Sequence, residues 1–247
     1  MREITLFPLG STAACRYAAE FLARSAVTLV DHPTPEVTHL LLDVPSFAPN
    51  GTLRGGGDIA KTLQMLPPDT VVIGGNLSHS ALAYHTTIDL LKIADFLAQN
   101  AAITADCALQ VAAPLLSATF SETPTLIIGW GRIGKCLSKL LKAIGSPVTI
   151  AARKESDRAM LNALGYDAVD IPDIPSRLPN IRLLFNTVPE LVLPKEQLSL
   201  YRNCVKIELA SKTGIESDDV VIARGLPGVH APESSGRLIA QTILNLL

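Results

Sequence analysis

Short hydrophobic runs alternate with amphipathic stretches through the first hundred residues of the chain. Two stretches predict helices: residues 13–23, with apolar positions at helical spacing, and residues 59–66, which Asp58 can cap. Aliphatic runs predict strands at residues 4–7, 27–30, 39–44 and 71–73. Because helices lie between these strands, the pattern predicts an α/β domain with a parallel sheet.

The alternation becomes more regular after Thr125. Strands are predicted at residues 125–129, 148–152, 183–186, 205–209 and 220–223. Helices are predicted at residues 132–144, 156–164 and 233–246, and Gly165 closes the second of them. Strands joined by crossovers of this length form a doubly wound parallel sheet.

The stretch between these two patterns is harder to assign. Residues 82–99 fit either a helix or a short strand, and Thr104 is placed to cap an apolar run over residues 105–118, typical of a buried helix. We therefore expect two domains. Residues 1–99 form a smaller flavodoxin-like α/β domain for substrate binding or docking, and residues 100–247 form a Rossmann dinucleotide-binding domain. The last helix could instead pack back on the first domain.

Composition narrows the classes of function. The chain is 48% hydrophobic and has a formal charge of -2, which indicates a globular protein without the basic surface that nucleic acid binding requires. No uncharged stretch is long enough for a bilayer, and no signal-peptide pattern is present, so we expect a cytoplasmic protein. The four cysteines are scattered without metal-ligand spacing, so we expect no metal site.

The clearest motif is Gly129-Trp130-Gly131-Arg132-Ile133-Gly134, a GxGxxG pattern between a predicted strand and a predicted helix. In this context the first glycine permits a tight turn, the second lets the backbone approach a pyrophosphate, and the third lets helix and strand pack closely. The helix N-terminus then offers free N–H groups to the phosphates. The motif predicts dinucleotide binding.

In Rossmann domains, the residues at the end of the next strand determine whether NAD or NADP is bound. NAD-binding domains place an acid there for the ribose 2′-hydroxyl, whereas this chain has Arg153 and Lys154, two cations that suit the 2′-phosphate of NADP. We expect NADP. NAD remains the alternative, with Arg153 and Lys154 merely solvated and Glu155 or Asp157 turned back to the ribose.

Two further strand ends and one loop carry candidate site residues. Cofactor contacts are expected from Asn186, Thr187, Pro189 and Ala210, which follow the strands at 183–186 and 205–209. Ser211 and Lys212 lie just beyond, where Lys212 could meet an anionic substrate. His230, in the Gly- and Pro-rich segment 225–236, is a candidate acid-base group. Each of these residues could equally serve turn chemistry or a structural contact.

Several of these motifs resemble those of the family of dipicolinate synthase A subunits. They are the GxGxxG motif, Ala151 to Arg153, Phe185 to Pro189, Glu208 to Ser211 and Gly225 to Pro232. The resemblance covers most of residues 100–247, and its N-x-x-x-T-A-acid pattern at Asn100 to Asp106 makes Thr104 a substrate candidate. In the first domain only Leu42 to Ser46 corresponds, with Ser46 as a substrate candidate, because this chain is shorter there than typical members.

The resemblance implies an NADP-dependent enzyme of sporulation that works with the flavoprotein-like B subunit of dipicolinate synthase. Its reaction would convert a hydroxylated tetrahydrodipicolinate to dipicolinate by loss of water and a two-electron oxidation. Arg132, Lys212 and Arg224 are the cations available for a small dicarboxylate. Lys212 stands where the family has Arg, His230 where it has an aliphatic residue, and Glu233 where it has Lys.

Two other functions remain open. His230 near the last helix weakly favours an enzyme like the D-2-hydroxyacid dehydrogenases, although Lys212 replaces their arginine and no glutamate partner for the imidazole is evident. The chain could also be a non-catalytic protein that binds NADP within a larger complex. Its apolar run at 105–118 and its last helix suggest packing across domains or a homo-oligomer.

Overall fold

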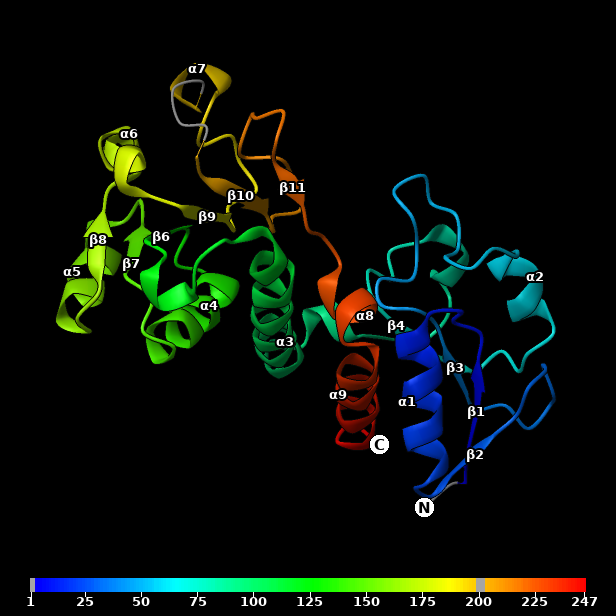
Figure 1. The fold of residues 1–247 in the computed structure, drawn as a ribbon. Coiled ribbons are helices and arrows are strands. Elements are labelled where there is room, and N and C mark those ends of the chain that lie inside the picture. Colours follow the sequence, from blue (N-terminus) through cyan, green and yellow to red (C-terminus); the bar gives the residue numbers. More distant parts are fainter. Residues whose placement is uncertain (1–2, 199–202) are drawn as a thin grey trace. The chain divides into compact units, whose positions relative to one another are not determined.

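The computed structural model describes residues 3–198 and 203–247, and these form two compact units, each with its own parallel sheet (Figure 1). Unit 1 comprises Met1–Asn100 and Pro227–Leu247, and unit 2 comprises Ala101–Leu226. The last helix thus lies in unit 1, which is the alternative that the sequence left open. No helix in the described ranges has the length and apolar character needed to cross a bilayer.

The sheet of unit 1 has the strand order β2-β1-β3-β4-β5, all parallel. This is the flavodoxin-like order expected from the sequence. Helix α1 (Ala13–Ala23) begins at the predicted first residue, after a Thr12 cap, and α2 (Ile59–Gln64) begins at the predicted Asp58 cap. The strands are β1 (Ile4–Pro8), β2 (Val27–Leu29), β3 (His39–Leu41), β4 (Val71–Gly74) and β5 (Thr87–Asp89).

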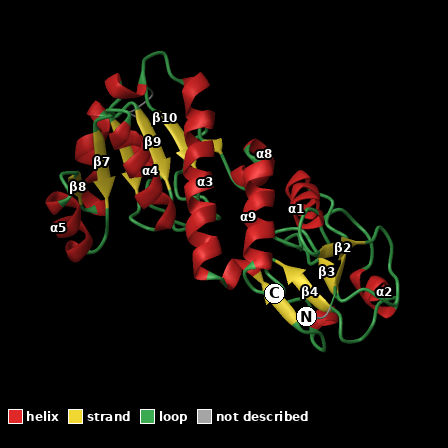
Figure 2. Cartoon of the chain, turned by 90° about the horizontal axis from the view of Figure 1, so that it is seen from below, coloured by secondary structure: helices red, strands yellow, loops and turns green. Residues whose placement is uncertain are grey.

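The sheet of unit 2 has the order β11-β10-β9-β6-β7-β8, a doubly wound arrangement. Its strands β7, β8, β9 and β10 are labelled in Figure 2. The expected two-domain fold with a C-terminal Rossmann sheet is therefore confirmed. Helices α4 (Arg132–Ala143) and α5 (Glu155–Ala163) pack on its strands. The strands are β6 (Thr125–Ile128), β7 (Val148–Ala151), β8 (Asp167–Val169), β9 (Leu183–Asn186), β10 (Val205–Glu208) and β11 (Val221–Ile222).

The predicted helix start at Thr104 is wrong. Helix α3 runs without a break over Ala94–Ala112, so Thr104 lies in its middle, 8% exposed, rather than at its cap. The sequence on both sides of Thr104 is rich in alanine, which favours a continuous helix. Thr104 is buried on this helix instead of capping it. Residues 82–99 are divided among β5, a 3-10 turn at Leu90–Lys92 and the start of α3, so residues 96–98, the part that could have formed a short strand, are helical.

Shorter elements complete unit 2, and the sequence patterns missed most of them. Strand β8, helix α6 (Ile174–Arg177) and helix α7 (Lys195–Leu198) have three or four residues each, too few to show a hydrophobic period. A further short helix, α8 (Leu226–His230), lies in the Gly- and Pro-rich segment before the last helix and, except for Leu226, belongs to unit 1.

In unit 1, helix α9 (Pro232–Leu244) packs closely along α1. Gly236 makes this approach possible, because a Cβ there would lie 2.5 Å from Tyr17 Cβ and 2.6 Å from the carbonyl oxygen of Ala14. The ring of Phe21 lies under the guanidinium groups of Arg24 and Arg237, 5.4 and 4.8 Å from its centroid. The apolar face of the last helix is thus covered within its own unit.

Candidate functional site

Four strand ends meet in register along one edge of the unit 2 sheet. Ile128 of β6 pairs with Ala151 of β7 on one side and with Asn186 of β9 on the other, and Asn186 pairs with Glu208 of β10. The chain winds from β6 toward β8 and then returns to place β9 on the opposite side of β6. Ligands of doubly wound sheets bind outside such a switch point. The structure therefore brings the predicted motifs together at that edge.

The GxGxxG turn has the backbone geometry that dinucleotide binding needs. Gly129 has φ +105, which L side chains rarely adopt, and a Cβ on Gly134 would lie 2.2 Å from the carbonyl oxygen of Gly129. A Cβ on Gly131 would meet nothing within 4 Å. The space in front of Gly131 is thus open, whereas the other two glycines are required by the turn and the helix packing.

Helix α4 presents its N-terminus to this open space. Its N-cap is Gly131, which makes no side-chain cap hydrogen bond, so the first amides of the helix have no side-chain acceptor. Arg132 at the first turn is exposed, and Ile133 is half-buried. Trp130 packs edge-on against Tyr166, with 6.0 Å between ring centroids. Uncapped amides and an exposed cation fit an anionic pyrophosphate.

The loop after β7 is held by hydrogen bonds and exposes two cations. Arg158 of α5 donates to the carbonyl oxygens of Ala152 and Arg153, at 2.8 and 2.9 Å, and forms an ion pair with Asp170 at 3.1 Å. The exposed guanidinium of Arg153 lies 3.5 Å from the exposed carboxylate of Glu190. Lys154 is exposed and makes no side-chain cap hydrogen bond to α5. Glu190, which the sequence patterns did not single out, is therefore a neighbour of the proposed 2′-phosphate cations.

The turn after β9 is held from inside the protein. Asn186 is fully buried and donates from Nδ2 to Val188 O and to Glu208 Oε1, at 2.9 and 2.8 Å. Thr187 Oγ1 donates to Ile128 O at 2.8 Å, next to Gly129. Pro189 follows on the exposed side of the turn. Asn186 thus orients the turn from inside the protein, Thr187 is half-buried beside Gly129, and Pro189 is exposed.

The loop after β10 carries Ser211 and Lys212, both exposed. Ala210 at its start is 5% exposed, and its amide donates to Glu208 Oε1 at 3.0 Å. Arg224 braces the loop, since its Nε donates to Ala210 O at 2.8 Å and its Nη2 to Thr213 Oγ1 at 3.1 Å. The guanidinium of Arg224 is therefore engaged in holding the loop, whereas Lys212 has no hydrogen bond or ion pair to any described residue.

Of the remaining candidates, Thr104 lies in unit 2, in the middle of α3, whereas His230 and Ser46 lie in unit 1. His230 ends α8, and its exposed ring makes no hydrogen bond to any residue that the structure describes. Ser46 is fully buried, where its hydroxyl donates to Asp43 O at 2.7 Å and accepts from Gly75 N at 3.0 Å. Glu233 forms an i,i+4 pair with Arg237 at 2.9 Å. This helix-surface pair accounts for the acid at a position where the resembled family has a cation.

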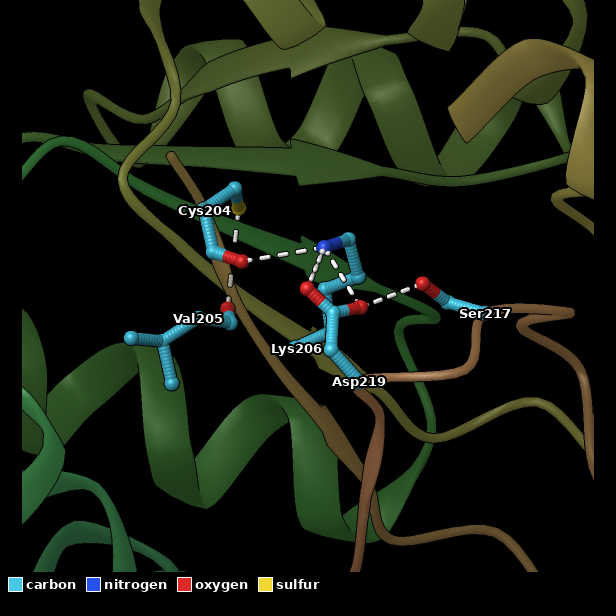
Figure 3. Close-up of polar contacts among 5 residues, drawn as sticks. All are labelled: Cys204, Val205, Lys206, Ser217 and Asp219. Atoms are coloured by element: carbon cyan, nitrogen blue, oxygen red, sulfur yellow. Dashed lines mark hydrogen bonds and ion pairs between the residues drawn. The ribbon is translucent and has the colours of Figure 1, made fainter. Parts of the chain in front are cut away.

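A second polar cluster lies at the opposite, amino-terminal edge of the unit 2 sheet (Figure 3). Lys206 is 2% exposed and donates to both carboxylate oxygens of Asp219 at 2.9 Å and to Cys204 O at 3.2 Å. A hydrogen bond from Ser217 and the Lys206 ammonium hold the pKa of Asp219 below its usual value. Burial raises the pKa of the Cys204 thiol to about 11.

This cluster borders a polar pocket of about 720 Å³, which is remote from the GxGxxG turn because it lies beyond the first residues of the strands. Within the described ranges no group of His, Cys, Asp and Glu is arranged to hold a metal ion.

The chain is similar to known proteins in sequence and in fold. No family model matches the chain. Over 177 residues it is 24% identical to the A subunit of dipicolinate synthase from Bacillus subtilis (strain 168), a match that covers 68% of this chain and 60% of that protein. The chain resembles the dipicolinate synthase A subunit.

Solved structures extend the likeness to the whole fold. The crystal structure of the dipicolinate synthase A subunit from Bacillus halodurans has a TM-score of 0.82 at 21% identity, over 99% of this chain and 97% of that one. A transhydrogenase from Sinorhizobium meliloti has a TM-score of 0.73 at 13% identity, over 98% and 92%. A D-isomer specific 2-hydroxyacid dehydrogenase from Lactobacillus delbrueckii ssp. bulgaricus has a TM-score of 0.52 at 12% identity, over 98% and 95%. At these identities the structural matches show the fold alone.

Proposed function

We propose that the chain is an oxidoreductase similar to the A subunit of dipicolinate synthase, with NADP bound at the carboxyl edge of the unit 2 sheet. The observation that carries the proposal is the open space at Gly131, which lies in front of the uncapped N-terminus of α4 and next to the switch point between β6 and β9. Two neighbouring glycines in the same turn are required sterically, so this one unhindered glycine marks where a ligand approaches.

In the proposed complex, the amides of α4 and Arg132 hold the pyrophosphate, and Arg153 and Lys154 hold the 2′-phosphate. The nicotinamide supplies a two-electron acceptor when it is bound. Lys212 and Ser211 meet a carboxylate of a small dicarboxylate substrate, a hydroxylated tetrahydrodipicolinate. To give dipicolinate, this substrate loses water and then a hydride, which the bound nicotinamide accepts, and a proton. Lys212 suits this role because its ammonium has no partner among the described residues.

The same proposal places the protein in the cytoplasm of a sporulating cell, beside a partner like the B subunit of dipicolinate synthase, and in a homo-oligomer. The resemblance to one member of a multi-subunit synthase supports the partner. The hydroxyacid dehydrogenase alternative depended on His230, which lies in unit 1 without a described carboxylate partner to orient its imidazole. That alternative therefore gains no support from the site.

Cofactor choice is the first test, with Trp130 as the probe because it is the chain's one tryptophan and lies within the GxGxxG turn. We expect Arg153→Glu to raise the Kd for NADP about 10- to 100-fold, because a charge-assisted hydrogen bond to phosphate is replaced by repulsion. The Kd for NAD should change much less, since NAD has no 2′-phosphate. Fluorescence titration with each cofactor measures both constants.

Two matched variants control this titration. Lys139→Glu makes the same charge reversal at an exposed position further along α4, and should leave both constants unchanged. Glu190→Gln frees Arg153 from its ion pair and should tighten NADP binding by at most about fivefold, the value of an exposed pair. Equal losses for NADP and NAD in Arg153→Glu would contradict the proposed 2′-phosphate site.

A further inference from the structure

Glu208 is a buried carboxylate without a cation. It is the last residue of β10, is fully buried, and forms no ion pair with any described side chain. Four N–H groups donate to it instead. Oε1 accepts from Asn186 Nδ2 and Ala210 N at 2.8 and 3.0 Å, and Oε2 accepts from Gly214 N and Ile215 N at 2.7 and 3.3 Å.

These four donors belong to separate segments of the candidate site. Ala210 and Gly214 are the two ends of the loop that carries Ser211 and Lys212, so one carboxylate closes that loop. Through Asn186 the same carboxylate holds the turn after β9, whose Val188 amide donates back to Asn186 Oδ1 at 3.0 Å. Glu208 therefore joins the proposed substrate loop to the turn that borders the cofactor.

The connection continues across the switch point to the GxGxxG turn. Thr187, next to Asn186, is fixed to β6, because its amide and hydroxyl both donate to Ile128 O, at 2.9 and 2.8 Å. A Cβ on Gly129 would lie 2.4 Å from Thr187 Oγ1. A shift of the turn after β9 would consequently displace the backbone at Gly129, the first glycine of the motif.

The four hydrogen-bond donors around Glu208 require an acid at position 208. All four partners are donors, and an ionised carboxylate is the side chain that offers only acceptors. A glutamine amide would point its N–H groups at one pair of these donors and leave them buried without an acceptor. Gly214 must also stay a glycine, since a Cβ there would lie 2.4 Å from Asn186 Nδ2 and 2.5 Å from Glu190 O.

We propose that Glu208 is the positioning residue of this site: its buried carboxylate holds the substrate loop at Ser211 and Lys212 in a set geometry relative to the GxGxxG turn. This rests on the proposed function for the ligands, but the geometry itself belongs to the free protein. Glu208 acts through Asn186, Ala210 and Gly214, because all four of its donors are groups of the protein itself.

The test compares Glu208→Gln with Glu216→Gln, which removes an exposed acid from the same connection without touching this network. In Glu208→Gln without ligand, we expect hydrogen exchange of the Ala210, Gly214 and Ile215 amides to speed up about 10- to 100-fold. Exchange in β6 should keep the wild-type rate, and the emission of Trp130 should shift. Glu216→Gln should match the wild type in all three respects.

Ligand binding gives the second readout. Glu208→Gln should raise the Kd for NADP about tenfold, and raise KM for the substrate more than it lowers kcat. If Glu208→Gln does not fold, Glu208→Asp, which keeps the charge but shortens the reach, should show the same local exchange pattern at smaller size. Wild-type exchange and emission in a folded Glu208→Gln, or an equal rise of exchange in β6, would overturn the proposal. Failure of the wild type to bind either dinucleotide would overturn the proposed function and leave the exchange result as a test of positioning alone.

Discussion

The three glycines of the GxGxxG turn meet three different physical demands. Gly129 is required by its positive φ, Gly134 by the carbonyl oxygen 2.2 Å from where a Cβ would be, and Gly131 by neither. In the proposed complex a ligand would account for a glycine at 131, because backbone that approaches a pyrophosphate leaves no room for a methyl group. The steric surroundings thus separate two glycines that the fold requires from one that only the proposed ligand would require.

This separation predicts opposite outcomes for two alanine variants. Gly131→Ala should fold with wild-type stability and lose NADP affinity by at least about tenfold, because its methyl group occupies the approach to the phosphates. Gly134→Ala should lower the free energy of unfolding by about 1–3 kcal/mol, because α4 must move away from the turn. Denaturant unfolding and Trp130 titration measure the two effects. Wild-type NADP affinity in Gly131→Ala would place the phosphates elsewhere.

Sequence reasoning found the residues that follow the strands at this site and missed the role of Glu208 in holding them. Arg153, Thr187 and Lys212 follow predicted strands, so their position at the carboxyl edge could be deduced from the strand pattern alone. Glu208 lay in a recognised motif, yet its role depends on donors up to 22 residues away in the sequence. The available signal was an acid at the carboxyl end of a predicted buried strand, where a charge without a cation beside it is costly and implies dedicated donors.

At the scale of elements, the close contact of α1 and α9 depends on one glycine. Gly236→Ala should lower the free energy of unfolding by about 1–3 kcal/mol, because its methyl group would overlap Tyr17 Cβ and backbone atoms of Ala14 and Ala18. Gly228→Ala is the control, since a Cβ there meets nothing within 4 Å. Urea unfolding followed by circular dichroism compares the two. A Gly236→Ala protein as stable as the wild type would mean that α9 can slide along α1 without cost.

Elements with a clear hydrophobic period were predictable, and elements defined by tertiary contacts were not. Helix α1 and strand β9 have the predicted bounds, because α1 has an amphipathic period and β9 combines three consecutive apolar residues with the asparagine that ends the strand. The start of α3 was misplaced because Thr104 matches a local capping pattern that its burial overrides. Strand β8 owes its existence to pairing with β7, which a three-residue segment cannot reveal.

At the scale of the whole molecule, each unit has a sheet and a core of its own, and the proposed cofactor contacts belong to unit 2 alone. Saturating NADP should therefore slow hydrogen exchange within Ala101–Leu226, most at the ends of β6, β7 and β9. Exchange in β1 to β4 should stay unchanged. At about 100 times its Kd, the ligand should add about 2.7 kcal/mol to the stability of the unit it binds. Slower exchange confined to unit 1 would contradict the proposed location.

The chain completes unit 1 last, although it begins there. Pro227–Leu247 belongs to the same unit as the first hundred residues, and all of Ala101–Leu226 lies between them in sequence. During synthesis on the ribosome, the Rossmann unit can therefore fold before α9 has been made, while the face of α1 that contacts α9 is still exposed to solvent. A nascent or prematurely terminated chain would expose that apolar face to chaperones and proteases. Quality control should therefore recognise a chain that lacks α9 by its incomplete unit 1, even when unit 2 is fully folded.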